Sequence, residues 1–282
     1  MKARSYTSRR ALLNRFVCLG FCAQIPALTL PDRASADASA ATSLSEPEAQ
    51  QVAAVTDGDT LRLDRGEVLR LAGIEAPKRV LAGDPDMAAL ETEAQHSLAR
   101  LVGAGAITVR YDRMRRDRYG RLLAQGFNAA GLWLQAAQVE NGSARIHGDG
   151  ANRLGLRDLL ALEATARDRG LGIWRHPVFA VRDAGDPGLK RLAGSFQIVA
   201  GRVATAAAIK DLGYINFGSD RRTDLTLVLK RPVLQMMKAE ADPTMIDLPS
   251  LGGRRIRCRG WLDLHDGPSI EISHPEQIEI LE

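Results

Sequence analysis

The sequence predicts a mainly β protein with some α-helix, made of two small β-barrels in succession. Three observations predict this fold. Short runs that alternate apolar and polar residues, typical of half-buried strands, occur in both halves of the 282-residue chain. Three amphipathic helical patterns fall in the first half, and a stretch with several Pro and Gly residues at 177–193 separates the halves. We therefore expect a barrel with three helices over 51–176, a linker over 177–193 and a second barrel over 194–282.

The first barrel is expected to begin with residues 52–63, VAAVTDGDTLRL, which alternate as a strand as far as Leu63. The turn DRGE joins this run to VLRLAGI at 68–74, so the two runs are expected to form a hairpin. Two further strands are expected in AITVRYD at 106–112 and, after the charged turn RRDRYGR, in LLAQGF at 122–127.

Three helices are expected in the same half. Apolar residues at steps of three and four between Met87 and Leu101 indicate an amphipathic helix, which two glycines end. A second helical pattern surrounds LWLQAAQVENG, and a third runs from Asn152 to about Arg169 before GLGIW.

The second barrel is expected from five short strand-like runs: FQIVAGRVATAA, YINFG, DLTLVLK, RRIRCRGWL and PSIEISHPEQIEIL. A helical candidate, VLQMMKAE, lies between the third and fourth runs. Five short strands with a helix at this place are typical of an OB-type barrel.

The N-terminus predicts export. Residues 1–36 carry a net charge of +5, whereas the whole chain carries +4. The rest of the chain therefore has a net charge of about −1, which says little about the substrate. The doublet Arg9-Arg10 precedes an apolar stretch and small residues, which resembles a twin-arginine signal peptide followed by a tether at 37–50. We expect a periplasmic or secreted protein with no stable membrane span after cleavage. An uncleaved anchor is the alternative.

Acidic and basic residues gather around the expected hairpin. Asp57 and Asp59 share the turn TDGD, where the glycine is expected to relieve the backbone. Alone this pattern indicates only a turn, but Arg70 and Glu75 on the neighbouring strand and Arg121 in DRYGR change its meaning. Carboxylates and a carbonyl can hold a hard cation, and paired arginines can bind phosphate oxygens. The set is therefore suited to charge that develops on a phosphate.

The motifs VTDGDTLRL, RLAGIEAP, DRYGR and GLGIW, in this order, make residues 50–175 resemble a thermonuclease, or staphylococcal nuclease-like, domain. The resemblance implies a five-stranded OB barrel with three helices that hydrolyses DNA and RNA phosphodiesters with Ca²⁺. It implies that Asp59, Glu75 and the backbone carbonyl of Ala76 surround the metal. Arg70 and Arg121 would clamp the phosphate as catalytic residues.

The same resemblance implies that Arg118 and Tyr119 bind the substrate by lining a nucleotide pocket. Lys78 is the departure, because it stands where the family usually has a glutamate that orders the attacking water. A lysine with a reference pKa of about 10.4 cannot accept a proton near neutrality, and it would repel a cation. Either a solvent-bound base or the metal's own hydroxide then activates the water, or hydrolysis is impaired or absent. The further alternative is that Lys78 works as a third cation on the phosphate or the leaving group.

The second barrel offers one candidate surface. Period-two alternation along RRIRCRGWL places basic and aromatic side chains on one face, as in platforms for single strands. These residues are Arg255, Arg257, Arg259 and Trp261. The alternative is the ordinary outer wall of a barrel. The segment also resembles OB-like modules appended to bacterial thermonuclease-family proteins, with no catalytic residues implied.

The leading hypothesis is an exported endonuclease-type hydrolase that uses Ca²⁺ on DNA or RNA, with single strands as the expected form. One competing hypothesis is an exported module that binds nucleic acid or protein without hydrolysis. Another is an envelope protein whose barrels serve protein contacts. Arg70, Asp59 and Arg121 favour the first hypothesis and Lys78 favours the second.

Overall fold

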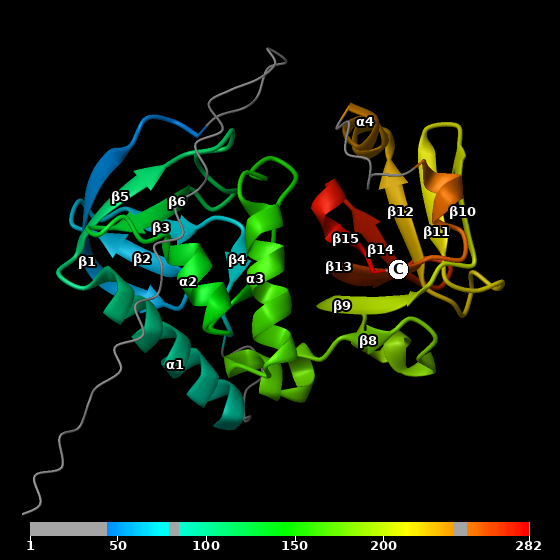
Figure 1. Ribbon diagram of the computed structural model, residues 1–282, viewed down its shortest axis with the longest axis horizontal. Coiled ribbons are helices and arrows are strands. Elements are labelled where there is room, and N and C mark those ends of the chain that lie inside the picture. The colour runs from blue at the N-terminus through cyan, green and yellow to red at the C-terminus, as the bar shows by residue number, and fades with distance from the viewer. Residues whose placement is uncertain (1–43, 79–84, 240–246, 282) are drawn as a thin grey trace, which may run out of the picture.

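The structure is a computed structural model that describes residues 44–78, 85–239 and 247–281 (Figure 1). Two β units lie side by side, the N-terminal one in blue to green and the C-terminal one in yellow to red. The expected signal peptide, 1–36, and half of the expected tether lie outside the described residues. No helix in the described ranges is long and apolar enough to cross a membrane.

The first unit is a closed five-stranded barrel with the strand order β1-β2-β3-β6-β5. Its neighbouring strands are antiparallel except for β3 and β6, which run parallel. The strands are β1 (Glu48–Asp57), β2 (Thr60–Leu63), β3 (Val68–Leu71), β5 (Ala106–Arg110) and β6 (Leu122–Asn128). The alternation in the sequence places Leu61, Leu69 and Val109 in its core, fully buried.

Three helices and a short ribbon complete this unit. They are α1 (Pro85–Val102), α2 (Leu134–Glu140), α3 (Leu156–Asp168), β4 (Ile74–Glu75) and β7 (Arg145–Ile146). α1 buries Met87, Ala94 and Leu98 on one face, as the spacing predicts. α3 begins four residues later than expected because Gly155, with φ of 81°, lies in the left-handed region and ends the preceding loop.

The second unit is a curled eight-stranded sheet with its own hydrophobic core. Its order is β10-β11-β12-β14-β13-β9-β8, and β15 pairs with β13. The strands are β8 (Arg182–Asp183), β9 (Ser195–Arg202), β10 (Thr205–Ile209), β11 (Leu212–Asn216), β12 (Thr226–Lys230), β13 (Arg255–Leu264), β14 (Pro268–Ile272) and β15 (Ile278–Ile280). One helix, α4 (Arg231–Ala239), follows β12, and the mainly β prediction for both halves is confirmed.

The described residues also include five short 3-10 helices: Gly172–Arg175, Pro177–Phe179, Pro187–Leu192, Leu248–Leu251 and Pro275–Gln277. The stretch 177–193, expected to be a linker, contains two of them together with β8. β8 pairs in parallel with β9, and Leu189 is buried against the second core. Phe179 of the same stretch packs with Met87 and Ile173 of the first unit, so the stretch contacts both units.

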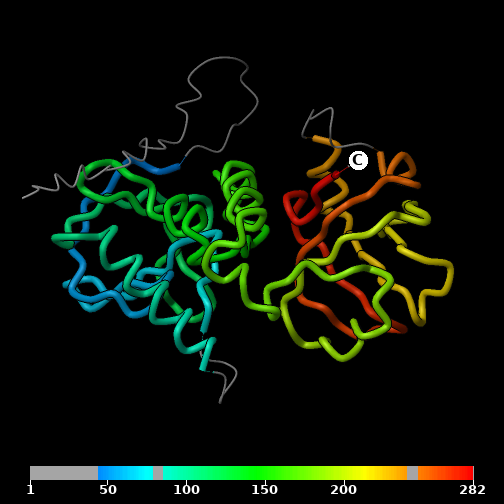
Figure 2. The backbone as a smooth tube through the Cα atoms, turned by 60° about the horizontal axis from the view of Figure 1, so that its bottom comes forward, coloured from blue at the N-terminus to red at the C-terminus, as the bar shows by residue number. Residues whose placement is uncertain are grey.

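A buried ion pair joins the two units where α3 meets β13 and β15, a junction visible in Figures 1 and 2. The Arg259 side chain is 1% exposed, and its guanidinium lies 2.8 Å from Glu163 Oε2 and 2.6 Å from Glu279 Oε1. Glu163 Oε1 accepts the Ile146 backbone N–H at 2.7 Å. A second ion pair, between Arg153 and Glu276 at 2.6 Å, crosses the same junction.

The prediction of a basic face on the second unit is corrected, because this junction covers part of that face. Arg259 is covered by Glu163 of the first unit, and Arg257 is paired with Glu279 at 3.1 Å. Only Arg255 and Trp261 of the four residues are exposed, and Trp261 is 56% exposed. Alternation along β13 identified a shared side of the strand correctly, but it does not reveal that another unit covers part of that side.

Arg259→Met is expected to lower the free energy of unfolding by about 1.5–3 kcal/mol, because Glu163 and Glu279 lose their shared buried partner and keep only Arg167 and Arg257. Urea unfolding of the full chain measures this loss. The control is Lys230→Ala, which breaks the exposed 2.7 Å ion pair with Glu271 and should cost about 0–1 kcal/mol. Equal losses in the two variants would contradict a structural role for the Arg259 ion pair.

Candidate functional site

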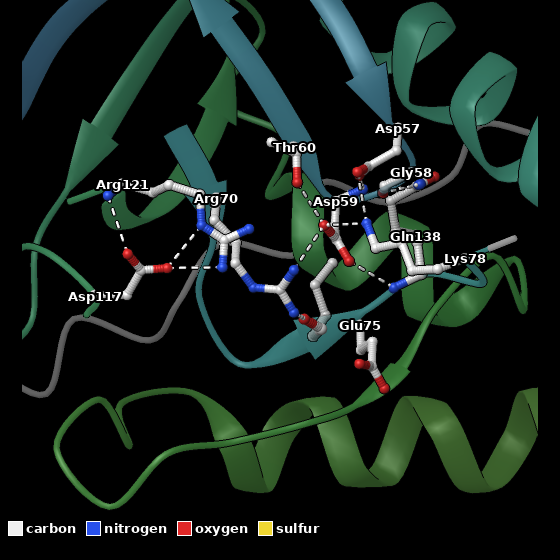
Figure 3. A network of polar contacts seen from close by, with 12 residues as sticks. Asp57, Gly58, Asp59, Thr60, Arg70, Glu75, Lys78, Asp117, Arg121 and Gln138 are labelled. Carbon is white, nitrogen blue, oxygen red and sulfur yellow. Dashed lines mark hydrogen bonds and ion pairs between the residues drawn. The ribbon is translucent and has the colours of Figure 1, made fainter. Parts of the chain in front are cut away.

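Asp59 is the centre of a polar network at the start of β2 (Figure 3). Its side chain is 0% exposed and receives four contacts. Oδ1 lies 2.7 Å from Thr60 Oγ1, 3.1 Å from Arg70 Nη1 and 2.9 Å from Lys78 Nζ. Oδ2 accepts the Ala76 backbone N–H at 2.7 Å. Burial acts to raise the pKa of Asp59, but the charges of Arg70 and Lys78 hold that pKa below its ordinary value.

Lys78 lies between two carboxylates. Its Nζ is 2.6 Å from Asp57 Oδ2 and 2.9 Å from Asp59 Oδ1, and its side chain is 28% exposed. Burial and the charge of Asp59 raise the pKa of Asp57, against the hydrogen bond from Lys78. The sequence predicts that Lys78 repels a cation and cannot act as a base. It does not reveal these two carboxylates, which lie on either side of the ammonium and balance its charge.

Gly58 makes the turn between Asp57 and Asp59 possible by its size. A Cβ on Gly58 would lie 2.6 Å from the Ala94 Cβ of α1 and 2.7 Å from the Ala76 Cβ. Its φ is outside the left-handed region, so close packing is the reason for glycine, and the expected relief of the backbone is not. The buried amide of Gln138 donates to the Gly58 carbonyl at 2.7 Å and ties the turn to α2.

Glu75 belongs to a different contact from the one expected. Arg145 Nε and Nη2 lie 3.0 Å and 2.7 Å from Glu75 Oε2, across the β4–β7 ribbon. The guanidinium of Arg145 also stacks 4.5 Å from the ring centre of Phe196 in the second unit. Glu75 therefore contributes its charge to the junction of the two units.

The residues present do not fit the Ca²⁺ that the resemblance implies. The carboxylate of Asp59 is already surrounded by donors, and Ala76 presents its N–H to that carboxylate. Glu75 is paired with Arg145. Within the described ranges no three His, Cys, Asp or Glu side chains gather closely enough to hold a metal. A site for Ca²⁺ requires six or more oxygen ligands.

Arg121 faces the same side of the barrel as Arg70. Arg70 is paired with Leu123 in the parallel β3–β6 ladder, and Arg121 lies two residues before Leu123, so the two arginines share a face. Figure 3 shows the Arg70 guanidinium directed at Asp59 and the Arg121 guanidinium held by Asp117. Asp117 holds Arg121 in place, because Arg121 Nε and Nη2 each lie 2.7 Å from its Oδ2.

Arg118 and Tyr119 lie at the rim of the site in the turn before β6. Tyr119 is 68% exposed, and the guanidinium carbons of Arg118 and Arg121 lie 4.8 Å and 5.4 Å from its ring centre. The Asp117 carboxylate accepts the Tyr119 N–H at 2.9 Å and shapes this turn. Their role in binding a nucleotide stays a prediction.

Three functional residues were missed at the sequence level: Asp117, Gln138 and Arg145. Asp117 begins the turn DRYGR, where an acid that caps backbone N–H groups is a common turn feature. Gln138 is one of two glutamines among the apolar residues of α2, and such buried amides signal buried hydrogen bonds. Arg145 carried no signal, because its partner Glu75 lies 70 residues away.

Comparison with known families gives a match over most of the first unit. Residues 68–176 match the model of the family described as Staphylococcal nuclease homologue. The match contains Arg70, Lys78 and Arg121, and it begins at β3, so the turn that carries Asp57 and Asp59 lies outside it. No curated protein matches the chain.

Gly58→Ala is expected to lower the free energy of unfolding by about 1–3 kcal/mol, because the added methyl group overpacks the contact between the turn and α1. Urea unfolding measures the change. Gly252→Ala is the control, since its Cβ would meet only the Pro249 carbonyl oxygen at 3.4 Å. Equal stability of the parent and Gly58→Ala would show that α1 can move away from the turn.

Proposed function

Because residues 68–176 form a staphylococcal nuclease-like domain, we propose that the protein is a nuclease-type hydrolase that cleaves phosphodiester bonds in DNA or RNA. The observation that carries the proposal is the shared face of Arg70 and Arg121, each fixed by a carboxylate. Two oriented guanidinium groups on one face are suited to the oxygens of a single phosphate.

Arg70 keeps binding capacity beyond its structural contacts. A guanidinium has five N–H donors, and Asp59 and the Ile74 carbonyl each receive one, at 3.1 Å and 3.3 Å. The fork can therefore bind phosphate oxygens while Asp59 holds it in place. Donors that are fixed before the substrate arrives stabilise the charge that develops on a phosphate during cleavage.

The exposed turn with Arg118 and Tyr119 supports a single-stranded substrate. An exposed ring next to cationic groups can stack on an unpaired base while the phosphate binds the arginines. A duplex keeps its bases stacked on one another, which leaves this ring without a partner. Single-stranded oligonucleotides are therefore the substrate of choice for the assay.

The alternative function is binding of nucleic acid without hydrolysis. Lys78 favours it, because an ammonium held by two carboxylates does not accept a proton from water. The same face of Arg70 and Arg121 would then hold the phosphate without cleaving it. The two functions share a site and differ in whether product forms.

Arg70→Lys is expected to lower cleavage of a fluorogenic single-stranded oligonucleotide by about 10²–10³-fold, because the bidentate fork is lost while the charge remains. The control is Arg65→Gln, which changes an exposed arginine in the turn after β2 and should cleave as the parent does. Parent-like cleavage by Arg70→Lys would place the chemistry elsewhere. A parent that binds the oligonucleotide without cleaving it, with binding lost in Arg70→Lys, would establish the alternative.

Export to the periplasm or the medium is part of the proposal, and Arg9-Arg10 before an apolar stretch supports it. Mass spectrometry of the protein purified from its own cells is expected to find an N-terminus near Asp37. A chain that retains Met1 in the cytosol would contradict export.

A further inference from the structure

Asp57 and Asp59 direct oxygens at one point, and that point is the Lys78 ammonium. Asp57 Oδ2 and Asp59 Oδ1 lie 2.6 Å and 2.9 Å from Nζ. Two carboxylates that converge on one point form an arrangement that attracts a cation. We propose that the Lys78 ammonium is a built-in cation that replaces a divalent metal, so that this site binds phosphate without metal.

The charges at the site are balanced without a metal. The carboxylates of Asp57 and Asp59 face the guanidinium of Arg70 and the ammonium of Lys78. A divalent cation at the same place would add two positive charges beside these cations and would have to displace the ammonium. The next carboxylate, that of Glu75, is held by Arg145.

Lys78 is also placed to contact the phosphate. Its Nζ and Arg70 Nη1 both bind Asp59 Oδ1, at 2.9 Å and 3.1 Å, so the two cations share one buried anchor. An ammonium has three N–H donors, of which Asp57 and Asp59 receive two. The side chain is partly exposed, and the third donor therefore has access to the solvent side from which a substrate approaches.

This inference rests on the proposed function only for the identity of the substrate as a nucleic-acid phosphate. A tethered ammonium supplies positive charge but does not activate a bound water as a metal does. The inference therefore concerns how the phosphate is bound, and it holds whether or not the bond is then cleaved.

The first experiment measures binding of Ca²⁺ alone to the full mature chain. Thermal unfolding of the parent and of Lys78→Arg is expected to be the same with millimolar Ca²⁺ and with chelator. In Lys78→Glu the added carboxylate can join Asp57 and Asp59 around a cation, so Ca²⁺ at 100 times its dissociation constant should raise the melting temperature by about 5 °C or more. Lys190→Glu, an equal charge change at an exposed lysine, should show no Ca²⁺ effect.

The second experiment measures affinity for a single-stranded oligonucleotide with Ca²⁺ and with chelator. The parent should bind equally in both, and Lys78→Gln should lose about tenfold or more in chelator. If Lys78→Gln loses this affinity while its melting temperature equals that of the parent, Lys78 binds the phosphate. A purely structural role would lower the melting temperature as well. If Lys78→Gln does not fold, the comparison uses Lys78→Met, which also removes the charge and should show the same loss of affinity in chelator.

A parent that binds Ca²⁺ with a melting-temperature rise, or that loses oligonucleotide affinity in chelator, would overturn the built-in cation. Cleavage that requires Ca²⁺ would also overturn it while leaving the nuclease function intact. Metal-independent binding by a parent that cleaves nothing would instead support the built-in cation and contradict hydrolysis. The two proposals therefore fail by different results.

Discussion

The buried carboxylate of Asp59 is the constraint on which the site depends. A charge with no exposure to water is stable only when donors surround it, and here they come from four places in the chain. Thr60 begins β2, Arg70 lies on β3, and Ala76 and Lys78 follow β4. Neutralising one carboxylate thus fixes the positions of the hairpin and of the segment after it.

The fold of the first unit was largely predictable from the sequence. Strand alternation and helix periodicity report burial, and burial places the hairpin and α1 where the patterns indicate. The turn with Asp57 and Asp59 and the opposite strand with Arg70 are close in sequence, so their meeting could be expected from a hairpin. Long-range pairs carry no such local signal.

Three of the differences from expectation are of one physical kind. Lys78 was judged by its own charge, whereas its effect depends on two carboxylates that fold against it. Glu75 was assigned to a metal because of its position in a motif, whereas it forms an ion pair with Arg145 of β7. Arg259 was assigned to an outer face because alternation fixes only which residues share a side. The role of each residue depends on its ion-pair partner in the folded chain, and a sequence pattern does not identify that partner.

The Glu163–Arg259 contact has a consequence for how this chain can be divided. Glu163 is buried in the first unit, accepts a backbone N–H of β7 there, and pairs both with Arg167 of its own helix at 3.2 Å and with Arg259 of the second unit at 2.8 Å. Separation of the units would leave Glu163 with Arg167 alone and Arg259 with Glu279 alone, and it would open both buried pairs to solvent. A chimera that keeps the nuclease-like half therefore gains stability if it inherits an arginine opposite Glu163, and the natural module for engineering is the whole pair.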